Sequence, residues 1–333
     1  MSNVELSPDE RTLCRGSEAT PTGPEVELLA PREVPLGGPR AMLVQRSLPN
    51  RDRRMVGAWC FADCFGPDDL SGGPGMQVPP HPHIGLQTVT WLVDGDVRHR
   101  DSLGSDQFVR PGELNLMTAG RGIAHSERTP ETAGSLHGVQ LWVAMPDEDR
   151  TGEPHFEHHR DLPRLEFGDV RGTVLMGEVD GAVSSARSHS PLVGAEFVLP
   201  AGGSTVLPLE PDFEHAVLTL SGRLTAAGAG VPAATMLYLG LGRREAPVHA
   251  ETESRFLLLG GVPFEEDLVM WWNFVGRSHD EIVTAREEWE GGRARNGDSG
   301  PFGAVPGDSE ASLPAPALPQ AELRPRSRVR RRS

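Results

Sequence analysis

The sequence contains no lysine, and all 32 of its basic residues are arginine. The formal net charge is −15, because Asp and Glu together number 47. Six of the arginines lie between Glu322 and Ser333, so the rest of the chain is more acidic still. An acidic body repels nucleic acid, because phosphate binding needs a basic surface. We therefore expect no direct nucleic-acid partner, and we attribute the arginine bias to codon composition.

Cysteines and long hydrophobic runs are also scarce. The three cysteines, Cys14, Cys60 and Cys64, are too few for a disulfide framework, and none forms a Cys-x-x-Cys redox pair. The chain has no run of about 18 apolar residues that could cross a membrane. Residues 1–10 are polar and acidic, unlike a signal peptide. These features predict a cytoplasmic protein without a membrane partner, and we expect a monomer.

Glycine and proline are abundant, with 39 Gly and 30 Pro, and they separate many short apolar runs. This pattern is typical of an all-β protein. We expect a disordered N-terminus over residues 1–22, one β-rich domain over 23–150, and a second over 160–290. Ser278 followed by Glu281 fits a capping box and predicts a short C-terminal helix from about 279 to 290. An arginine-rich tail over 291–333 is expected to be disordered.

Two pairs of potential metal ligands carry most of the functional information. His81 and His83 are separated by one residue, and so are His125 and Glu127. On a β-strand, residues i and i+2 point to the same face, so two such strands can direct four ligands at one interior point. Three imidazoles and one carboxylate suit a first-row metal such as Fe(II) better than Mg or Ca. Four protein ligands would leave two positions of an octahedral metal open for chemistry.

The residues around both pairs indicate strands and turns. The first pair precedes the apolar run Leu86–Val93, which ends in the turn Asp94-Gly95-Asp96. The second pair follows the run Leu114–Met117 and a glycine-rich bend over residues 118–124. A lone His-x-His pair would more often be structural. Two pairs about forty residues apart, each next to a predicted strand, favour a metal site instead.

The sequences of these segments resemble the pirin family of the cupin superfamily. The resemblance rests on His-Pro-His-x-Gly, His-Arg-Asp-Ser-Leu-Gly and Met-Thr-Ala-Gly-Arg-Gly-Ile-x-His-Ser-Glu, and it is dense from about Met55 to Pro146. It implies two cupin-type β-barrels (a bicupin) with one mononuclear iron per chain, held in the first barrel by His81, His83, His125 and Glu127. Relatives often have Glu at Gln87 and His at Cys64, and we expect neither difference to affect the metal.

The remaining histidines and the tryptophan pair have simpler interpretations. His99 and His137 lie in predicted strands, where a packed core histidine is the default and a role as a hydrogen-bond partner of the ligands is the alternative. His155, His158 and His159 fall in a charged stretch that we expect to be a solvated loop, although it could also hold an adventitious surface metal. In the second domain His215 and His249 have no ligand pair beside them, which favours structural roles. Trp271 and Trp272 are expected to pack against the C-terminal helix rather than line a pocket.

The resemblance implies an iron-dependent dioxygenase similar to quercetin 2,3-dioxygenase, with a flavonol or related aromatic enol and O2 as substrates. Glu127 is then the candidate general base, because a carboxylate ligand can detach and accept the proton of a bound hydroxyl group. The alternative is a non-enzymatic iron or redox sensor that acts through a protein partner, since some pirins are described as transcriptional co-regulators. A structural bicupin with a vestigial metal is a third interpretation. The sequence does not discriminate between the first two, because both need the same ligands.

Overall fold

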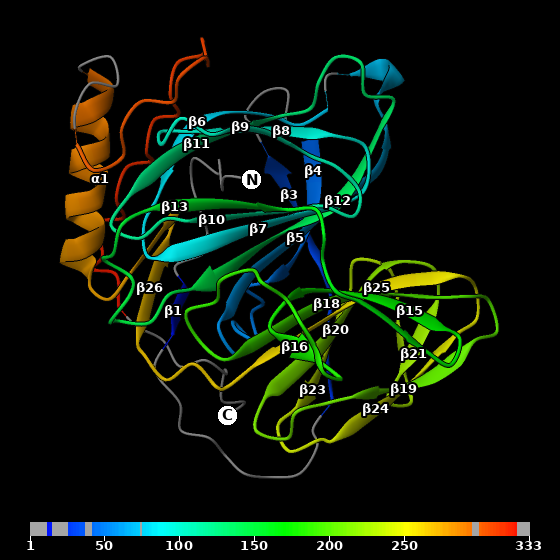
Figure 1. Cartoon of the computed structure of the whole chain (residues 1–333). Coiled ribbons are helices and arrows are strands. Elements are labelled where there is room, and N and C mark those ends of the chain that lie inside the picture. Colours follow the sequence, from blue (N-terminus) through cyan, green and yellow to red (C-terminus); the bar gives the residue numbers. More distant parts are fainter. Residues whose placement is uncertain (1–11, 15–25, 37–41, 74, 295–299, 325–333) are drawn as a thin grey trace.

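The computed structural model describes residues 12–14, 26–36, 42–73, 75–294 and 300–324. The described residues form two β-barrels that lie side by side (Figure 1), and each barrel is built from a seven-stranded and a four-stranded antiparallel sheet. The chain folds this way because short strands alternate with turns, many of which contain a glycine in a left-handed conformation. The predicted all-β, two-barrel architecture is confirmed.

The N-terminal barrel contains the strands that carry the two ligand pairs. Its seven-stranded sheet has the order β13-β10-β7-β12-β5-β4-β3, and its four-stranded sheet has the order β6-β11-β8-β9. A 3-10 turn, η2 (Leu70–Gly72), follows β5. The strands are β3 (Arg32–Leu36), β4 (Met42–Leu48), β5 (Trp59–Asp69), β6 (Gln77–His83), β7 (Leu86–Asp94), β8 (Val97–Asp101), β9 (Asp106–Val109), β10 (Leu114–Thr118), β11 (Ile123–Arg128), β12 (Ser135–Ala144) and β13 (His155–His159).

The C-terminal barrel repeats this plan. Its sheets have the orders β14-β15-β18-β25-β20-β23-β2 and β19-β24-β21-β22, and a small hairpin, β16–β17, lies beside them. The strands are β2 (Glu27–Leu29), β14 (Arg164–Phe167), β15 (Val170–Met176), β16 (Glu178–Val179), β17 (Ala182–Val183), β18 (Leu192–Leu199), β19 (Ser204–Pro208), β20 (Glu214–Ser221), β21 (Leu224–Ala226), β22 (Ala229–Val231), β23 (Met236–Gly240), β24 (Glu245–Ala250) and β25 (Ser254–Gly261).

The two barrels exchange segments, so the expected division at residues 150–160 is not kept by every strand. β2 precedes the N-terminal barrel in sequence but pairs with β23 of the C-terminal barrel. In the opposite direction, the hairpin of β26 (Leu268–Trp271) and β27 (Phe274–Gly276) follows the C-terminal barrel but contacts the N-terminal one through a bridge between Ile84 and Phe274. The last helix, α1 (His279–Ala294), packs beside this hairpin.

The large sheets of the two barrels pack against each other through a shared hydrophobic core. Trp59 on β5 donates from Nε1 to the carbonyl groups of Val193 and Gly260, both at 3.1 Å. Trp91 on β7 donates to Glu196 Oε1 at 2.9 Å. Both indoles are almost fully buried. Buried tryptophan supplies a large apolar area together with a directional N–H bond, which fixes the relative position of the barrels.

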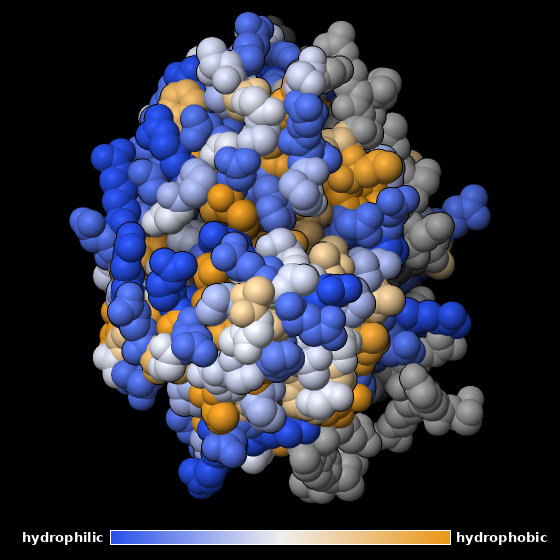
Figure 2. Space-filling model, turned by 90° about the vertical axis from the view of Figure 1, so that its right-hand side faces the viewer, coloured by the Kyte–Doolittle hydropathy of each residue, from blue (hydrophilic) through white to orange (hydrophobic). Residues whose placement is uncertain are grey.

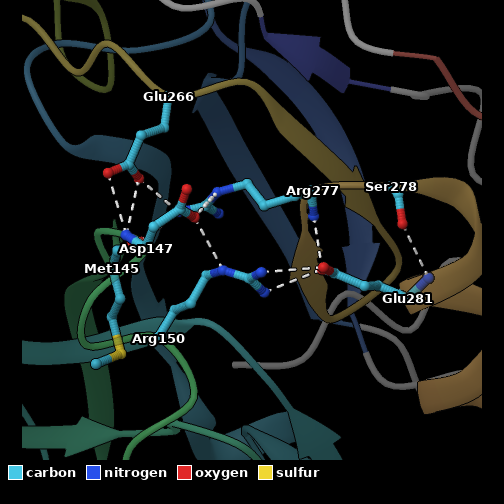
Figure 3. Close-up of polar contacts among 7 residues, drawn as sticks. All are labelled: Met145, Asp147, Arg150, Glu266, Arg277, Ser278 and Glu281. Carbon is cyan, nitrogen blue, oxygen red and sulfur yellow. Dashed lines mark hydrogen bonds and ion pairs between the residues drawn. The ribbon is translucent and has the colours of Figure 1, made fainter.

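A network of charged residues fastens the β26–β27 hairpin and helix α1 to the N-terminal barrel (Figure 3). The Arg277 guanidinium donates to Glu266 Oε2 at 2.6 Å and lies 2.7 Å from Asp147 Oδ1. Arg150 forms a two-pronged ion pair with Glu281, with both N–O distances at 3.0 Å. Ion pairs that are linked and partly buried constrain geometry better than isolated surface pairs. The network therefore couples the end of the chain to the barrel that contains the candidate site.

The predicted start of the C-terminal helix is confirmed. Ser278 caps it, because its Oγ accepts a hydrogen bond from the backbone N–H of Glu281 at 3.2 Å. The Glu281 carboxylate accepts from the backbone N–H of Arg277 at 2.8 Å, one residue earlier than in a regular capping box. Trp271 and Trp272 are buried in one cluster with Trp289 of the helix, as expected.

The expected disorder of residues 291–333 does not hold for residues 291–294, which end helix α1 beyond the predicted position 290, nor for the segment 300–324. This segment runs along α1 and the small sheet of the N-terminal barrel, where Ala124 N donates to the carbonyl of Phe302 at 3.0 Å. Trp289 Nε1 donates to the Leu313 carbonyl at 2.8 Å. Scattered apolar residues between prolines are sufficient here, because the helix and barrel already present a hydrophobic surface.

The expected disorder of residues 1–22 is also wrong for one short segment. Residues 12–14 form β1 (Thr12–Cys14), which pairs antiparallel with β26. The rest of that stretch, and the arginine-rich end at residues 325–333, lie outside the described residues.

The visible surface is predominantly hydrophilic, with hydrophobic residues distributed among charged ones (Figure 2). Among the described residues, no helix has the length and apolar character needed to cross a membrane.

Candidate metal centre

The two ligand pairs lie on adjacent strands of the small sheet. β6 carries His81 and His83, and β11 carries His125 and Glu127; the two strands are antiparallel, with His125 directly opposite His81. A β-bulge between His125 and Glu127 shifts the register and adjusts the direction of the second side chain. All four residues are at most 1% exposed. The strand geometry therefore directs both pairs into the barrel interior, as the spacing predicts.

The ligand atoms converge. One ring nitrogen from each of His81, His83 and His125 lies within 4.8 Å of the others, and Glu127 forms an overlapping group of the same dimension with His125 and His99. The Nε2 atoms of His83 and His125 are only 3.1 Å apart. Such distances are compatible with several nitrogen atoms and a carboxylate around one ion.

Hydrogen bonds to backbone carbonyl groups determine the tautomers of the first two histidines. His81 Nδ1 lies 2.8 Å from the carbonyl oxygen of Pro79, and His83 Nδ1 lies 3.1 Å from that of Asn273. A carbonyl oxygen only accepts, so each Nδ1 carries the proton and each Nε2 presents a lone pair. His81 Nε2 is buried without a hydrogen-bond partner among the described residues.

A hydrogen-bonded relay behind His125 leaves a third lone pair, on His125 Nε2. Asp101 Oδ2 lies 3.1 Å from His99 Nε2, and His99 Nδ1 lies 3.3 Å from His125 Nδ1. The carboxylate accepts the His99 Nε2–H, which leaves His99 Nδ1 to accept from His125 Nδ1–H. His125 Nε2 is then unprotonated. The relay fixes the tautomer and the ring orientation of His125 in the manner of outer partners in metal sites.

The electrostatics favour neutral imidazoles and an ionised relay carboxylate. Burial lowers the pKa of His81, His83 and His125 well below the usual range, and repulsion from neighbouring histidines adds to the effect on His81 and His125. Although burial by itself favours its neutral form, hydrogen bonds from His99 and Ser105 lower the pKa of Asp101.

These residues fit a metal ion. Three lone pairs that face one another repel unless a cation lies between them, and an unpaired buried ring nitrogen is costly. Neutral imidazoles are also the protonation state that metal binding requires. A borderline first-row metal suits this nitrogen-rich set better than Mg or Ca does.

The β26–β27 hairpin, which follows the C-terminal barrel in sequence, helps to orient His83. A two-residue turn, Trp272-Asn273, joins β26 to β27 and presents the Asn273 carbonyl to His83. Trp272 has a φ of 54°, a left-handed conformation that is strained for a bulky residue. Gly85 permits the close approach, because it has a φ of 67° and a Cβ there would lie 2.1 Å from the carbonyl oxygen of Val275.

Two residues that differ from the family pattern lie away from this point. Gln87 is on the outer face of β7, where its Nε2 donates to Thr118 Oγ1 at 2.9 Å and to the Arg187 carbonyl at 3.0 Å. Cys64 is buried in the core between the barrels, and burial raises the pKa of its thiol. The positions of Gln87 and Cys64 agree with the expectation that neither residue reaches the candidate ligands.

The other histidines are distributed over the molecule. His99 is buried and takes the alternative role as a hydrogen-bond partner of a ligand, described above. His137 is buried near the C-terminal barrel, where burial lowers its pKa despite a bond to the Leu220 backbone. His215 is buried inside the C-terminal barrel, whereas His249 lies on an outer face beside Ser204.

The stretch that contains His155, His158 and His159 is a strand and not the expected loop. It pairs with β10 as the outermost strand of the large sheet. Backbone hydrogen bonds to β10 hold this stretch as a strand, although its side chains are mostly polar or charged. His158 faces the barrel interior and contacts Asn115, whereas His159 contacts Glu157.

Comparisons with known proteins show the family to which this chain belongs. The model of the Pirin family matches residues 41–143, and the model of the Pirin C-terminal cupin domain matches residues 194–295. A Pseudomonas aeruginosa protein named "putative quercetin 2,3-dioxygenase" is 42% identical over 96% of this chain and 98% of its own length. The chain belongs to the pirin family. A Caulobacter vibrioides "Pirin-like protein" is 40% identical over 76% of this chain and 89% of its own length.

Solved structures of pirin relatives show the same fold. The crystal structure of a quercetin 2,3-dioxygenase from Acinetobacter baumannii superposes with a TM-score of 0.84 at 41% identity, covering 89% of this chain and 96% of that one. A bacterial pirin of Escherichia coli in complex with nickel(II) has a TM-score of 0.56 and 21% identity, over 72% of this chain and 99% of that one. At that identity the second match supports the fold alone.

Proposed function

We propose that this pirin is an iron-dependent dioxygenase that acts on a flavonol or a related aromatic enol, with His81, His83, His125 and Glu127 as the ligands of one Fe(II). The observation that carries the proposal is the set of three buried imidazole lone pairs beside a buried carboxylate. The names of the Pseudomonas and Acinetobacter relatives support the substrate class.

When bound, Fe(II) would supply Lewis acidity and one-electron chemistry toward O2 and an enol. The protein contributes a dry, rigid surrounding. Trp142 packs edge-on against His83, with ring centroids 5.2 Å apart, and Phe156 stacks on His99 at 4.5 Å. These aromatic contacts hold the rings in place and exclude water, which strengthens electrostatic interactions inside the barrel.

Glu127 is the group that we assign to proton transfer. Its Oε1 lies 3.4 Å from Thr90 Oγ1, which restrains the carboxylate on the side of the large sheet. A substrate hydroxyl group would lose its proton to a carboxylate oxygen of Glu127, and the resulting enolate is the electron-rich form that reacts with O2. Among the described residues, Glu127 groups with His125 and His99, with one potential ligand atom of each within 4.8 Å of the others.

The variant Glu127→Gln tests this role. Glutamine still offers an oxygen atom to the metal but cannot accept the proton at neutral pH, so iron should be largely retained while turnover falls by roughly 10²–10⁴-fold. Iron content and O2 uptake over a panel of flavonols and simpler phenols would be measured together. Glu157→Gln, on the outer face of β13, is the matched control and should behave like the parent.

Two outcomes would contradict the proposal. Parental turnover in Glu127→Gln would leave Glu127 as a ligand only. If the iron-loaded parent consumes no O2 with any compound of the panel, the iron or redox sensor that acts through a protein partner becomes the better interpretation.

A further inference from the structure

A row of polar side chains crosses the inner face of the large sheet opposite the ligands. Asn115 on β10, Thr90 on β7 and Gln140 on β12 are direct register partners on consecutive strands. Register partners share one face of a sheet, and Thr90 contacts Glu127, so this face is the inner one. Trp142 lies two residues after Gln140 on the same strand and therefore points the same way.

Three residues of this inner face each have a buried N–H donor that lacks a partner among the described residues: Asn115 Nδ2, Gln140 Nε2 and Trp142 Nε1. The exposed fractions of the three residues are 2%, 0% and 1%. Buried polar groups are nearly always paired, because an unpaired one destabilises the fold. Three unpaired donors on one face next to a candidate metal centre point to a ligand.

The orientation of the Asn115 amide follows from its neighbours. Arg160 Nε donates to His158 Nε2 at 3.1 Å, so His158 carries its proton on Nδ1. His158 Nδ1 then donates to Asn115 Oδ1 at 2.7 Å. The Asn115 NH2 group is left to the barrel interior.

The Gln140 amide is oriented in a similar way. Thr90 Oγ1 donates to Gln140 Oε1 at 2.9 Å, which leaves Nε2 unpaired. This amide belongs to the same hydrogen-bonded group as Glu127, because Thr90 contacts both side chains. Trp142 already uses its ring face on Phe61, at a centroid distance of 4.0 Å, and its edge lies against His83.

We propose that Asn115, Gln140 and Trp142 form a donor wall that selects the substrate by binding its acceptor oxygen atoms. All three unpaired atoms are donors, so the complementary ligand carries several acceptors, as a planar hydroxyketone or its enolate does. A ligand that presents no acceptor atom at these positions would leave the wall unpaired and bind less well. The inference rests on the proposed function for the binding of the ligand to the metal, and it adds the residues that donate hydrogen bonds to the oxygen atoms of the ligand.

The test uses zinc-loaded protein and maltol, a small hydroxyketone that chelates metals, so that binding is measured without turnover. Gln140→Met, Asn115→Leu and Trp142→Phe each keep the approximate side-chain volume and remove one donor. Each should weaken maltol binding by about tenfold in calorimetry, the effect expected for one lost hydrogen bond to a charged or strongly polar acceptor. Zinc content would be measured in every sample.

Gln87→Met is the matched control. Gln87 is equally buried on the same sheet, but it lies on the outer face, so maltol affinity should equal that of the parent. A second measurement does not depend on variant stability. In ¹⁵N-labelled parent protein, the indole N–H resonance that is absent from Trp142→Phe should move downfield when maltol saturates the site.

Parental affinity in all three donor variants, or an unmoved Trp142 resonance at saturation, would overturn the donor wall and show that solvent pairs with these donors. The donor wall and the proposed dioxygenase activity can fail independently of each other. If donor-dependent maltol binding occurs but no flavonol is oxidised, only the dioxygenase proposal fails. If flavonols are oxidised and the donor variants keep the parental kcat/KM, only the donor wall fails.

Discussion

The two barrels of this pirin share a strand plan but have opposite interiors. In the N-terminal barrel, β6 and β11 direct three histidines and a glutamate inward. The corresponding strands of the C-terminal barrel, β19 and β24, contribute Leu207, Ala246 and Val248 to an apolar core. The same arrangement of strands therefore accommodates either a polar site or a hydrophobic core.

This difference has an energetic meaning. Buried polar groups destabilise a fold unless hydrogen bonds or a bound ion compensate them, whereas packed leucine and valine stabilise it. The N-terminal barrel retains the polar groups and needs aid from outside its own sequence, such as the Asn273 carbonyl behind His83. The C-terminal barrel contributes stability and a rigid neighbour.

The largest effect should come from removing one ligand of the N-terminal barrel. In His83→Ala, metal affinity should fall by more than about 100-fold, beyond the usual cost of losing an outer hydrogen-bond partner. Metal content after dialysis measures the change. His249→Ala, on an outer face of the C-terminal barrel, should keep the parental content, and equal loss in both variants would show that the difference between the barrels is not the cause.

A smaller effect is expected behind His125. Asp101→Asn removes the charge that orients His99, so metal affinity should fall by about 10–100-fold while the four ligands remain. A competition titration with a chelator would measure it. The matched control is Asp106→Asn, which loses an exposed ion pair with Arg98 on the same sheet. Unchanged affinity in Asp101→Asn would mean that packing alone orients His125.

A third effect concerns His215, which is buried inside the C-terminal barrel. Burial lowers the pKa of His215 to about 4, although a bond to the Phe213 backbone opposes the shift. The folded-state pKa lies below the unfolded value of about 6.5, so its contribution to stability is complete above pH 6.5 and is lost as the pH falls toward 4.

This histidine should therefore cost about 2 kcal/mol of unfolding free energy between pH 7 and pH 5. In His215→Leu that part of the pH dependence should disappear, as measured by urea unfolding of metal-free protein at several pH values. The parent and His249→Leu should retain it. An identical pH profile for His215→Leu would place the His215 pKa near its ordinary value.

The features that the sequence predicted well are those with a local period. The alternation of i and i+2 put His81 and His83 on one face of a strand, and Ser278 marked the start of the helix. The all-β class could be inferred because turn residues separate the strands so regularly, whereas the two-barrel fold was implied by the resemblance to the pirin family. The ligand set itself remains a prediction until a bound metal is observed.

The features that were missed depend on register between distant strands. Asn115 and Gln140 look like ordinary strand residues, and only the pairing through Thr90 places both beside Glu127. A role of His99 as a hydrogen-bond partner of the ligands was only an alternative, and the part of Asp101 in the relay was missed, although the His-x-Asp spacing on β8 could have suggested it. The ordered segment at 300–324 was missed because its composition is that of a linker, and its order depends on a surface formed elsewhere.

The contact between His83 and Asn273 spans 190 positions of the chain, and it has a consequence for biosynthesis. The ligands are translated in the first half of the chain, but the carbonyl that fixes the His83 tautomer emerges much later, and the Phe302 carbonyl that pairs with Ala124 later still. A nascent N-terminal barrel therefore lacks two of the contacts that lie beside the candidate metal centre. The complete set of contacts exists only when translation is almost finished.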